Sequence, residues 1–355
     1  MGDAWGIKLL SVYILVAVGL AVVIALAGLV VGGTPGTPDG ASVEGQSPSQ
    51  FQPDALDIAV DPETGEIPVD GSGGRVLVDT EHANRLTRSE LEPLEEALFR
   101  AGHTLSFGED ISSTQAYNET LAGTNGLLVI QPTDGFSPDE RSVLRNYTDA
   151  GGHVVVLAEP TQTRVSIGLL GGSTTVVSFD ANNLTGEYGV RMGAESLFNI
   201  DDSANDNNFK SIYAAPRGDG PLTDGVETVT FDTAGYAVVR PDSDAEVIYA
   251  AAEGTQTLGS RRTAQYPTVA RTENFVFVAD TSFVDRGELY DADNEVFVGR
   301  LLSFLATGTA PERVPGPPAE PSSADNEADD ATGTPTPEPT PGNETTPTPS
   351  PMPSG

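Results

Sequence analysis

The 355-residue chain contains no cysteine. This absence excludes disulfide bonds, zinc sites built on thiolates, a cysteine nucleophile and a lipid-modified N-terminal cysteine. It does not argue against export from the cell, because a domain with a large apolar core does not need disulfides.

Basic residues are also scarce. The chain has 18 lysines and arginines against 52 aspartates and glutamates, which gives a formal charge of −34, and Lys8 and Lys210 are its only lysines. The scarcity argues against a nucleic-acid partner, because binding to phosphates requires a basic surface. The acidic residues are spread along the chain, which favours a surface adapted to high salt, where charge repulsion is screened. Local cation sites are the alternative, although an even spread does not mark a site.

One long apolar run, residues 7–31, is interrupted only by Lys8. At about 1.5 Å per residue it is long enough to span a bilayer. The basic residue before it and the acidic residues after it predict a cytoplasmic N-terminus at residues 1–6 and an extracellular C-terminal domain. Ala-Leu-Ala at 25–27 resembles a signal-peptidase site. We prefer an uncleaved anchor in the cell membrane, because the run exceeds a signal core and lacks a basic segment before it.

Two low-complexity segments flank the remainder of the chain. Residues 32–74 are rich in Gly, Pro, Ser and Asp and predict a flexible spacer. Residues 309–355 carry repeated Thr-Pro and predict a disordered acidic tail that resembles O-glycosylated stalks. Four Asn-x-Thr sequons fit an external glycoprotein: Asn118, Asn146, Asn183 and Asn343.

The segment between them, residues 75–308, alternates apolar runs of strand length with amphipathic helical patterns. Apolar runs at 75–79, 126–130 and 153–158 suit buried parallel strands. Helical patterns follow the first two of these, and the alternation predicts a doubly wound parallel sheet. The helices are expected to begin at two capping boxes, Thr87 with Glu90 and Ser137 with Glu140.

Residues 172–252 have a different pattern, with short β-rich runs separated by Gly, Asn and Asp turns. They predict a β-rich insertion or an antiparallel extension of the sheet. The chain then returns to the main sheet at "NFVFVA" and closes with a helix at 294–306. Asp293 or Asn294 is the expected N-cap of that helix.

Four stretches carry a resemblance to a known family: "VLVDTEHANRLTRSELEPLEEAL", "GLLVI", "GGHVVVLAE" and "VFVADTSFVDRGELYDADNEVFVGRLLSFL". Over about 75–306 they resemble domain-of-unknown-function family 4350, which is grouped with glutamine-amidotransferase-like and gliding-motility/intraflagellar-transport-like domains. The resemblance implies a flavodoxin-like three-layer α/β fold in a membrane-anchored haloarchaeal surface protein, and it implies no reaction. In true amidotransferases the nucleophile is a cysteine after a central strand. The corresponding turns near Gln131 and Glu159 have none, which excludes that type of glutamine hydrolysis.

In a doubly wound sheet, ligands bind beyond the carboxyl ends of the strands. The candidate crevice therefore consists of the polar residues that follow the predicted strands: Asp79, Glu81, His82, Asn84, Gln131, Glu159, Asp280 and Ser282. Such a set can bind a sugar, a small polar metabolite or a peptide. The alternative is that these residues cap helices and orient turns.

His82 is the candidate general base or metal ligand. One histidine beside carboxylates is weak evidence for zinc, and the acidic loop at 285–293 does not have EF-hand spacing. No glycine-rich segment matches a phosphate loop or a dinucleotide fingerprint, and no Gly-x-Ser-x-Gly elbow supports Ser282 as a nucleophile. We therefore expect no metal and no cofactor.

Two functions remain open. The first is a non-enzymatic binding or scaffold module of a cell envelope, which engages an envelope protein or a polar small ligand. The alternative is a hydrolase or carbohydrate-active enzyme that uses His82, Asp79 and Asp280. In the enzyme these three side chains must converge on one pocket, because proton transfer requires hydrogen-bond reach.

Overall fold

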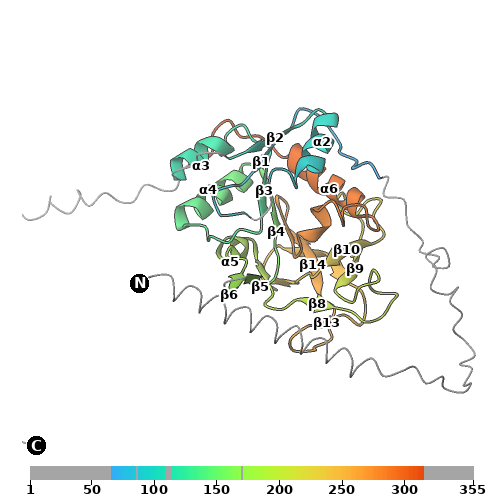
Figure 1. The fold of residues 1–355 in the computed structure, drawn as a ribbon. Helices are drawn as coiled ribbons and strands as arrows, with labels where there is room; N and C mark the ends of the chain where they lie inside the picture. The colour runs from blue at the N-terminus through green and yellow to red at the C-terminus, as the bar shows by residue number, and fades with distance from the viewer. Residues whose placement is uncertain (1–64, 85–86, 109–113, 169–170, 316–355) are drawn as a thin grey trace, which may run out of the picture. The chain divides into compact units, whose positions relative to one another are not determined.

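The computed structural model describes residues 65–315, with gaps at 85–86, 109–113 and 169–170 (Figure 1). Within these residues, no helix is long and apolar enough to cross a membrane. The predicted anchor at 7–31 lies outside the described residues, as do residues 32–64 and 316–355 of the two predicted low-complexity segments.

One nine-stranded mixed sheet organises the domain, in the order β10-β9-β12-β14-β15-β4-β3-β1-β2. Its parallel half consists of β1 (Arg75–Val78), β2 (Thr104–Phe107), β3 (Gly126–Ile130), β4 (His153–Leu157) and β15 (Phe275–Val278). Its antiparallel half consists of β9 (Ser211–Pro216), β10 (Val229–Asp232), β12 (Glu246–Ala251) and β14 (Pro267–Arg271). The prediction of an α/β domain with a large sheet that contains parallel strands is confirmed. Four strands extend this sheet in antiparallel fashion, which agrees with the antiparallel extension that the β-rich pattern left open.

Helices cover both faces of the parallel half. One layer, which contains α2 (Glu92–Arg100) and α6 (Asn294–Thr307), packs on residues such as Val78 and Val278. The other layer contains α3 (Thr114–Leu121) and α4 (Pro138–Asp149) and packs on residues such as Leu77 and Phe277. In Figure 1, α3 and α4 lie together on one side of these strands and α2 and α6 on the other.

The alternation of side chains along each strand determines where the polar residues after the strand point. Asp79 is two residues beyond Leu77 and continues the face covered by α3 and α4. Asp280 is two residues beyond Val278 and continues the face covered by α2 and α6. The two carboxylates therefore leave the sheet on opposite faces.

The predicted helix starts have different outcomes. Ser137 and Glu140 form a complete capping box at the start of α4, with Pro138 in the first turn. Helix α2 begins only at Glu92, with no side-chain cap. Thr87 and Glu90 instead close the preceding turn, where the Thr87 amide donates to Glu90 Oε2 over 2.6 Å.

The N-terminus of α6 also differs from the prediction. Asp293 occupies the N-cap position, but its side chain makes no capping hydrogen bond. Its Oδ2 atom accepts from the amides of Glu227 and Thr228, and the Asn294 side chain bonds both backbone groups of Thr230. These two residues therefore tie the helix to β10, because their polar atoms are used by the neighbouring chain rather than by the helix end.

The predicted β-rich stretch divides between the main sheet and smaller elements. Its strands β9, β10 and β12 belong to the main sheet. Three two-stranded pairs lie outside it: β5 (Gln162–Gly168) with β6 (Gly171–Val177), β7 (Val190–Met192) with β11 (Ala237–Val239), and β8 (Leu197–Phe198) with β13 (Gln256–Thr257). The remaining described elements are α5 (Asn182–Thr185), η3 (Gly186–Tyr188) and η4 (Ser282–Val284), which follows β15.

Candidate functional site

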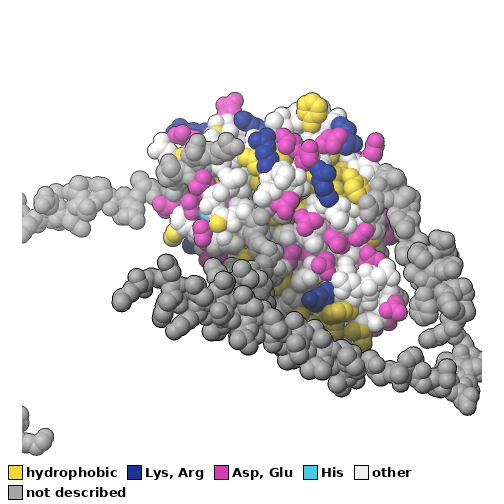
Figure 2. All heavy atoms as spheres, in the orientation of Figure 1, with side chains coloured by type: hydrophobic (Ala, Val, Ile, Leu, Met, Phe, Trp, Pro, Cys, Tyr) yellow, Lys and Arg dark blue, Asp and Glu magenta, His cyan; other side chains and the backbone are white. Residues whose placement is uncertain are grey.

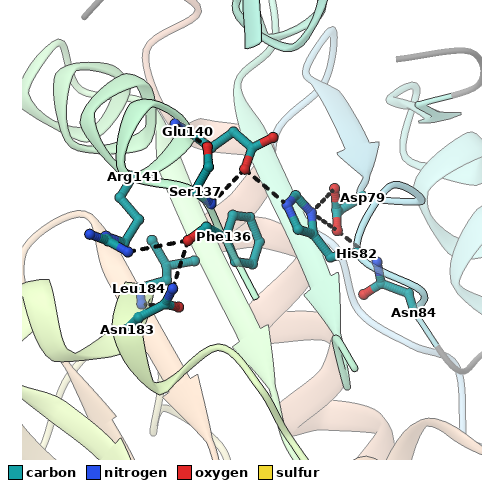
Figure 3. A network of polar contacts seen from close by, with 9 residues as sticks. All are labelled: Asp79, His82, Asn84, Phe136, Ser137, Glu140, Arg141, Asn183 and Leu184. Atoms are coloured by element: carbon teal, nitrogen blue, oxygen red, sulfur yellow. Dashed lines mark hydrogen bonds and ion pairs between the residues drawn. The ribbon is translucent and has the colours of Figure 1, made fainter. Parts of the chain in front are cut away.

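The loop after β1 carries a buried ion pair (Figure 3). Asp79 is fully buried, and both of its carboxylate oxygens lie 3.0–3.1 Å from Nδ1 of His82, which is 4% exposed. On the other side of the ring, Nε2 lies 3.5 Å from Oε2 of Glu140, in the first turn of α4. We call Asp79, His82, Asn84 and Glu140 the β1 network.

Packing fixes the orientation of the His82 ring. It stacks on Phe136 with a centroid distance of 3.6 Å and meets Tyr117 edge-on at 6.0 Å. Both aromatic residues belong to the apolar cluster beneath α3 and α4. The imidazole therefore has little freedom to turn toward any other partner.

The electrostatics of the β1 network favour a charged imidazole. Burial opposes the positive charge of His82, but hydrogen bonds to Asp79 and Glu140 outweigh it and raise its pKa to about 9. The hydrogen bond to His82 lowers the pKa of Glu140 to about 2 against the effect of burial. At neutral pH both ring nitrogens carry protons and face carboxylates. His82 then has no lone pair with which to act as a general base.

Asn84 completes the β1 network. Its amide nitrogen donates to Asp79 Oδ2 over 2.6 Å, and its oxygen accepts from the backbone amide of Ile130 at the end of β3. The turn between His82 and Asn84 places Ala83 at a φ of 50°, in the left-handed region. Glu81 lies exposed in the same loop. The β1 network thus joins the ends of two neighbouring strands to the start of α4.

A second network lies after β4 and β15 and contains Gln131, Glu159, Asp280, Thr281 and Ser282. We call it the β4–β15 network. Glu159 Oε1 accepts from the amide of Thr281 over 3.0 Å and from its hydroxyl over 2.8 Å. Gln131 Oε1 accepts from the amide of Glu159 over 2.5 Å. These bonds connect the ends of three adjacent parallel strands.

Asp280 is more buried than the sequence suggested. It is 0% exposed, and its Oδ1 atom accepts from the amide and hydroxyl of Ser282 and from the amide of Phe283. The prediction that its side chain faces an open crevice is therefore wrong, because this oxygen organises the 3-10 turn after β15. Its Oδ2 atom is buried and has no hydrogen-bond partner among the described residues.

The carboxyl groups of this network have raised pKa values. Burial raises the pKa of Glu159 to about 7, and hydrogen bonds from Thr281 and Gln162 oppose that effect. Burial, together with the nearby Glu159, raises the pKa of Asp280 well above its usual range. Among the described residues, no cationic side chain forms an ion pair with these two groups in the way that His82 does with Asp79.

A cavity of about 780 Å³ opens beside the β4–β15 network. Its lining is strongly polar and comes from several segments: Thr87, Glu90, Gln131, Glu159, Thr161, Gln162, Thr163, Ser196, Lys210, Asp232, Thr233, Leu258, Thr281, Ser282 and Asp285. We call it the strand-end cavity. Its volume lies within the range of small-molecule sites, about 300–1,000 Å³.

The structure divides five of the eight predicted crevice residues between two cavities, and Glu81, His82 and Asp280 are in neither described lining. Gln131, Glu159 and Ser282 line the strand-end cavity. Asp79 and Asn84 line a separate cavity of about 270 Å³ beside β1.

The enzyme hypothesis required His82, Asp79 and Asp280 to converge, and they do not. Strands β1 and β15 are separated by β3 and β4. At about 4.8 Å per strand spacing, their ends lie about 14 Å apart, and their carboxylates leave opposite faces. Concerted proton transfer among the three is therefore excluded by geometry.

Sequence reasoning missed several residues of these sites. Glu140 was assigned only as a capping residue, although it also pairs with His82 across 58 positions of sequence. Lys210 and Asp232 reach the strand-end cavity from the antiparallel half of the sheet. The β-rich pattern around them gave no signal that this region returns to the parallel strand ends.

The described residues hold no group of three or more His, Cys, Asp or Glu side chains that could bind a metal ion. The sequons of the described part lie on helices: Asn118 in α3, Asn146 in α4 and Asn183 in α5. The amide nitrogens of the latter two donate to the carbonyls of Pro315 and Phe136. Asn343 lies outside the described residues.

Comparison with known families identifies one protein family whose sequence pattern this chain matches. The family named Domain of unknown function (DUF4350) matches residues 108–302, more than half of the chain. The chain belongs to this family, as the sequence predicted. A search of curated proteins finds no match.

Solved structures with similar folds share little sequence with the chain. The mmIFT52 N-terminal domain is 14% identical, with a TM-score of 0.50, and the match covers 66% of this chain and 98% of that domain. A ThuA-like protein from Bacteroides uniformis is 12% identical, with a TM-score of 0.41 and coverage of 69% and 97%. A glutamine amidotransferase from Thermotoga maritima is 10% identical, with a TM-score of 0.35 and coverage of 65% and 96%. At such identity the likeness to the mmIFT52 domain concerns the fold alone.

Proposed function

We propose that the chain is a non-enzymatic binding module on the outer surface of a halophilic archaeal membrane, anchored through residues 7–31. The observation that carries the proposal is the β1 network. It holds His82 between two carboxylates as a structural cation. The side chain best suited to acid–base chemistry is thereby used within the fold, while the strand-end cavity stays available for a ligand.

The hydroxyl groups of the cavity support binding rather than nucleophilic attack. Ser282 donates its hydroxyl proton to Asp280 and accepts from the amide of Asp232. No imidazole lies among the residues that line the strand-end cavity. A serine nucleophile needs a base within hydrogen-bond reach, and here the partner of Ser282 is a buried carboxyl that holds a turn.

Surface charge supports the salt-adapted part of the proposal. Figure 2 shows acidic side chains scattered over the visible face of the domain, with few basic ones among them. We expect the melting temperature of the full chain to fall on dilution from molar salt to about 0.1 M, as the Debye length grows from about 3 to 10 Å. A melting temperature independent of salt over this range would reject the salt-adapted surface.

Topology can be tested on intact cells. Protease added from outside is expected to digest the C-terminal region and to spare residues 1–8. A protected C-terminal region would contradict an extracellular domain. A secreted form that begins near Gly28 would show that the apolar run is a cleaved signal.

Binding can be tested with matched threonine variants. Full-length wild type, Thr281→Val and Thr272→Val are recovered from native-salt membranes, and copurifying molecules are identified by mass spectrometry. Thr281 lines the strand-end cavity, whereas Thr272 lines a different cavity. We expect a molecule retained by wild type and Thr272→Val but lost from Thr281→Val. Equal retention by all three would contradict a binding function of this cavity.

One observation favours a second candidate function, a hydrolase or carbohydrate-active enzyme. Glu159 lines the cavity, and burial raises its pKa to about 7, near the value that suits a general base. Glu159, rather than His82, would then be the base. Turnover of a glycoside or ester by wild type that is lost in Glu159→Gln and kept in His82→Gln would establish this alternative.

A further inference from the structure

The two edges of the nine-stranded sheet differ in how their backbone groups are used. At the β10 edge, the Asp293 carboxylate accepts from the amides of Glu227 and Thr228, and the Asn294 side chain bonds both backbone groups of Thr230. Side chains from the start of α6 therefore occupy this edge and keep another strand from pairing there. The opposite edge is β2, which pairs only with β1 among the described strands.

The outer side of β2 carries backbone groups without partners. The amides of Thr104 and Gly108 donate to carbonyl oxygens in and next to β1. Because backbone groups alternate in direction along a strand, those of Leu105 and Phe107 point away from β1. Within the described part of the chain, no residue forms a hydrogen bond with these outward groups. Strand β2 also contains no charged residue and no proline, which are common protections of an edge strand.

Helix α2 packs beside β2 and carries Phe99, which at 78% is the most exposed large hydrophobic residue of the described part. Figure 2 shows a hydrophobic side chain at the upper edge of the domain, where Figure 1 places α2 and β2. Basic residues are scarce in this chain, yet all three glutamates of α2 form ion pairs: Glu92 with Arg286, Glu95 with Arg88 and Glu96 with Arg100. The surface formed by α2 and β2, which we call the β2 face, is therefore neutral and partly apolar.

We infer that the β2 face is a dimer interface, in which a second copy of the chain adds its own β2 in antiparallel fashion on a two-fold axis at Ser106. This axis places Leu105 of each copy opposite Phe107 of the other, so that their outward backbone groups bond one another. The two Ser106 residues form a non-hydrogen-bonded pair, whose small side chains fit a Cα separation of about 4.5 Å. Both α2 helices then lie on the same face of the joined sheet, with Phe99 at the interface.

Charge and symmetry make a second copy the partner that fits this face. Two chains with a formal charge of −34 repel each other where their acidic surfaces approach, whereas the charges of α2 are already cancelled. An interface on a two-fold axis must also be self-complementary. The sequence of β2 meets this condition about Ser106, because apolar side chains face apolar ones and serine faces serine. The inference concerns assembly and does not depend on a ligand in the strand-end cavity.

Sedimentation equilibrium of the full-length chain in detergent, at native salt, measures the dimer. Wild type is expected to be dimeric. Ser106→Asp places two carboxylates together at the axis and should raise the dissociation constant at least tenfold. Phe99→Ser should raise it severalfold. The matched changes elsewhere are Ser142→Asp, at a half-buried serine of α4, and Ile200→Ser, at a residue that is 75% exposed, and each should change it less than twofold.

The absence of cysteine allows a second test, which does not weaken the interface. Ser106→Cys places two thiols across the axis, at a Cα separation that suits a disulfide, about 4.4–6.8 Å. Oxidation should convert this variant to a covalent dimer and leave Ser142→Cys uncrosslinked. Melting temperatures show whether each variant is folded.

Three results would overturn the proposal. A monomeric wild type would mean that no second copy covers the β2 face. A dimer weakened equally by Ser106→Asp and Ser142→Asp would be held by the predicted anchor or by another surface. Crosslinking of Ser106→Cys no faster than that of Ser142→Cys would exclude a two-fold axis at β2.

Discussion

The β1 network and the β4–β15 network compensate their buried carboxylates in different ways. Each buries carboxylates at the carboxyl ends of parallel strands. In the first, His82 compensates Asp79 and Glu140 with a positive charge. In the second, Glu159 and Asp280 receive only hydroxyl, amide and backbone donors. The first arrangement is closed within the fold, and the second borders the strand-end cavity through Gln131, Glu159, Thr281 and Ser282.

The difference shows how electrostatics distinguishes a structural polar cluster from a site. A buried ion pair whose members satisfy one another holds elements together and has no capacity left for a ligand. A group of carboxyls with raised pKa values beside a cavity is a functional-site candidate. By this reasoning His82, the most conspicuous residue in the sequence, is structural, and Glu159 is the better candidate for function.

The largest expected effect comes from breaking the β1 network. His82→Ala leaves Asp79 buried and without a cationic partner, which should lower the free energy of unfolding by about 3–5 kcal/mol. Urea denaturation measures it. His103→Ala is the matched control. It loses hydrogen bonds to Gly74 and Asp70 but leaves no buried carboxylate without a cationic partner. Equal losses of stability in the two variants would show that the positive charge of His82 adds no stability beyond its packing and hydrogen bonds.

The two networks should respond to pH in different windows. The pKa of His82 is raised from 6.5 to about 9, so its stabilisation is complete below pH 6.5 and is lost as pH rises through 9. The pKa of Glu159 is raised from 4.5 to about 7, so stability falls between pH 4.5 and 7, where this carboxyl ionises in the unfolded chain but stays protonated in the fold. Across each of these pH ranges the free energy of unfolding should fall by about 3 kcal/mol.

Two variants separate these windows. His82 faces Asp79, Glu140 and Tyr117. In His82→Gln the slope of the free energy of unfolding against pH between 6.5 and 9 should disappear. In Glu159→Gln the slope between pH 4.5 and 7 should decrease, and the part that remains belongs to Asp280 and Glu288, whose pKa values are also raised by burial. If each variant kept the slope assigned to it, the assignment of charge to the two networks would be wrong.

A smaller effect is expected from two aspartates near the last helix. Asp280→Ala removes the acceptor for Ser282 and Phe283 and should cost about 1–3 kcal/mol. Asp293→Ala removes a tether to Glu227 and Thr228 and should cost about 1 kcal/mol. Denaturant midpoints compare them. A larger loss in Asp293→Ala would indicate that the helix-start role predicted from sequence dominates after all.

The smallest expected effect tests the turn of the β1 network. Ala83 has a φ of 50°, where an L-residue costs about 1 kcal/mol that glycine avoids. Ala83→Gly should therefore raise the melting temperature slightly or leave it unchanged. Ala150→Gly, at a position with a φ of −82°, is the control and should lower it. A clear loss of stability in Ala83→Gly would mean that this turn is not strained.

Some of these features were readable from sequence because they depend on neighbours in the chain. The apolar run at 126–130 coincides with β3, and the spacing of Ser137 and Glu140 predicted a capping box that forms. The membership of the family was also predicted, and the match at residues 108–302 confirms it.

Other features were not readable, because buried parallel strands are apolar on both faces and their pattern does not reveal which face a residue joins. Asp79 and Asp280 both follow such strands, so the sequence could not show that they point in opposite directions. Strand β9, within the β-rich stretch, and strand β14, which follows that stretch, were both missed. The pairing of Glu140 with His82 depends on how α4 crosses the sheet, which local patterns do not specify.

The charge of His82 tests the account most directly. Two-dimensional NMR of the ring nitrogens distinguishes the imidazolium, in which both are protonated, from either neutral tautomer. The account predicts a His82 imidazolium at pH 7.5 that loses its proton near pH 9, in full-length wild type at native salt. A neutral His82 at pH 7.5, with a pKa at or below 6.5, would contradict the structural role of the β1 network and would restore His82 as a candidate base.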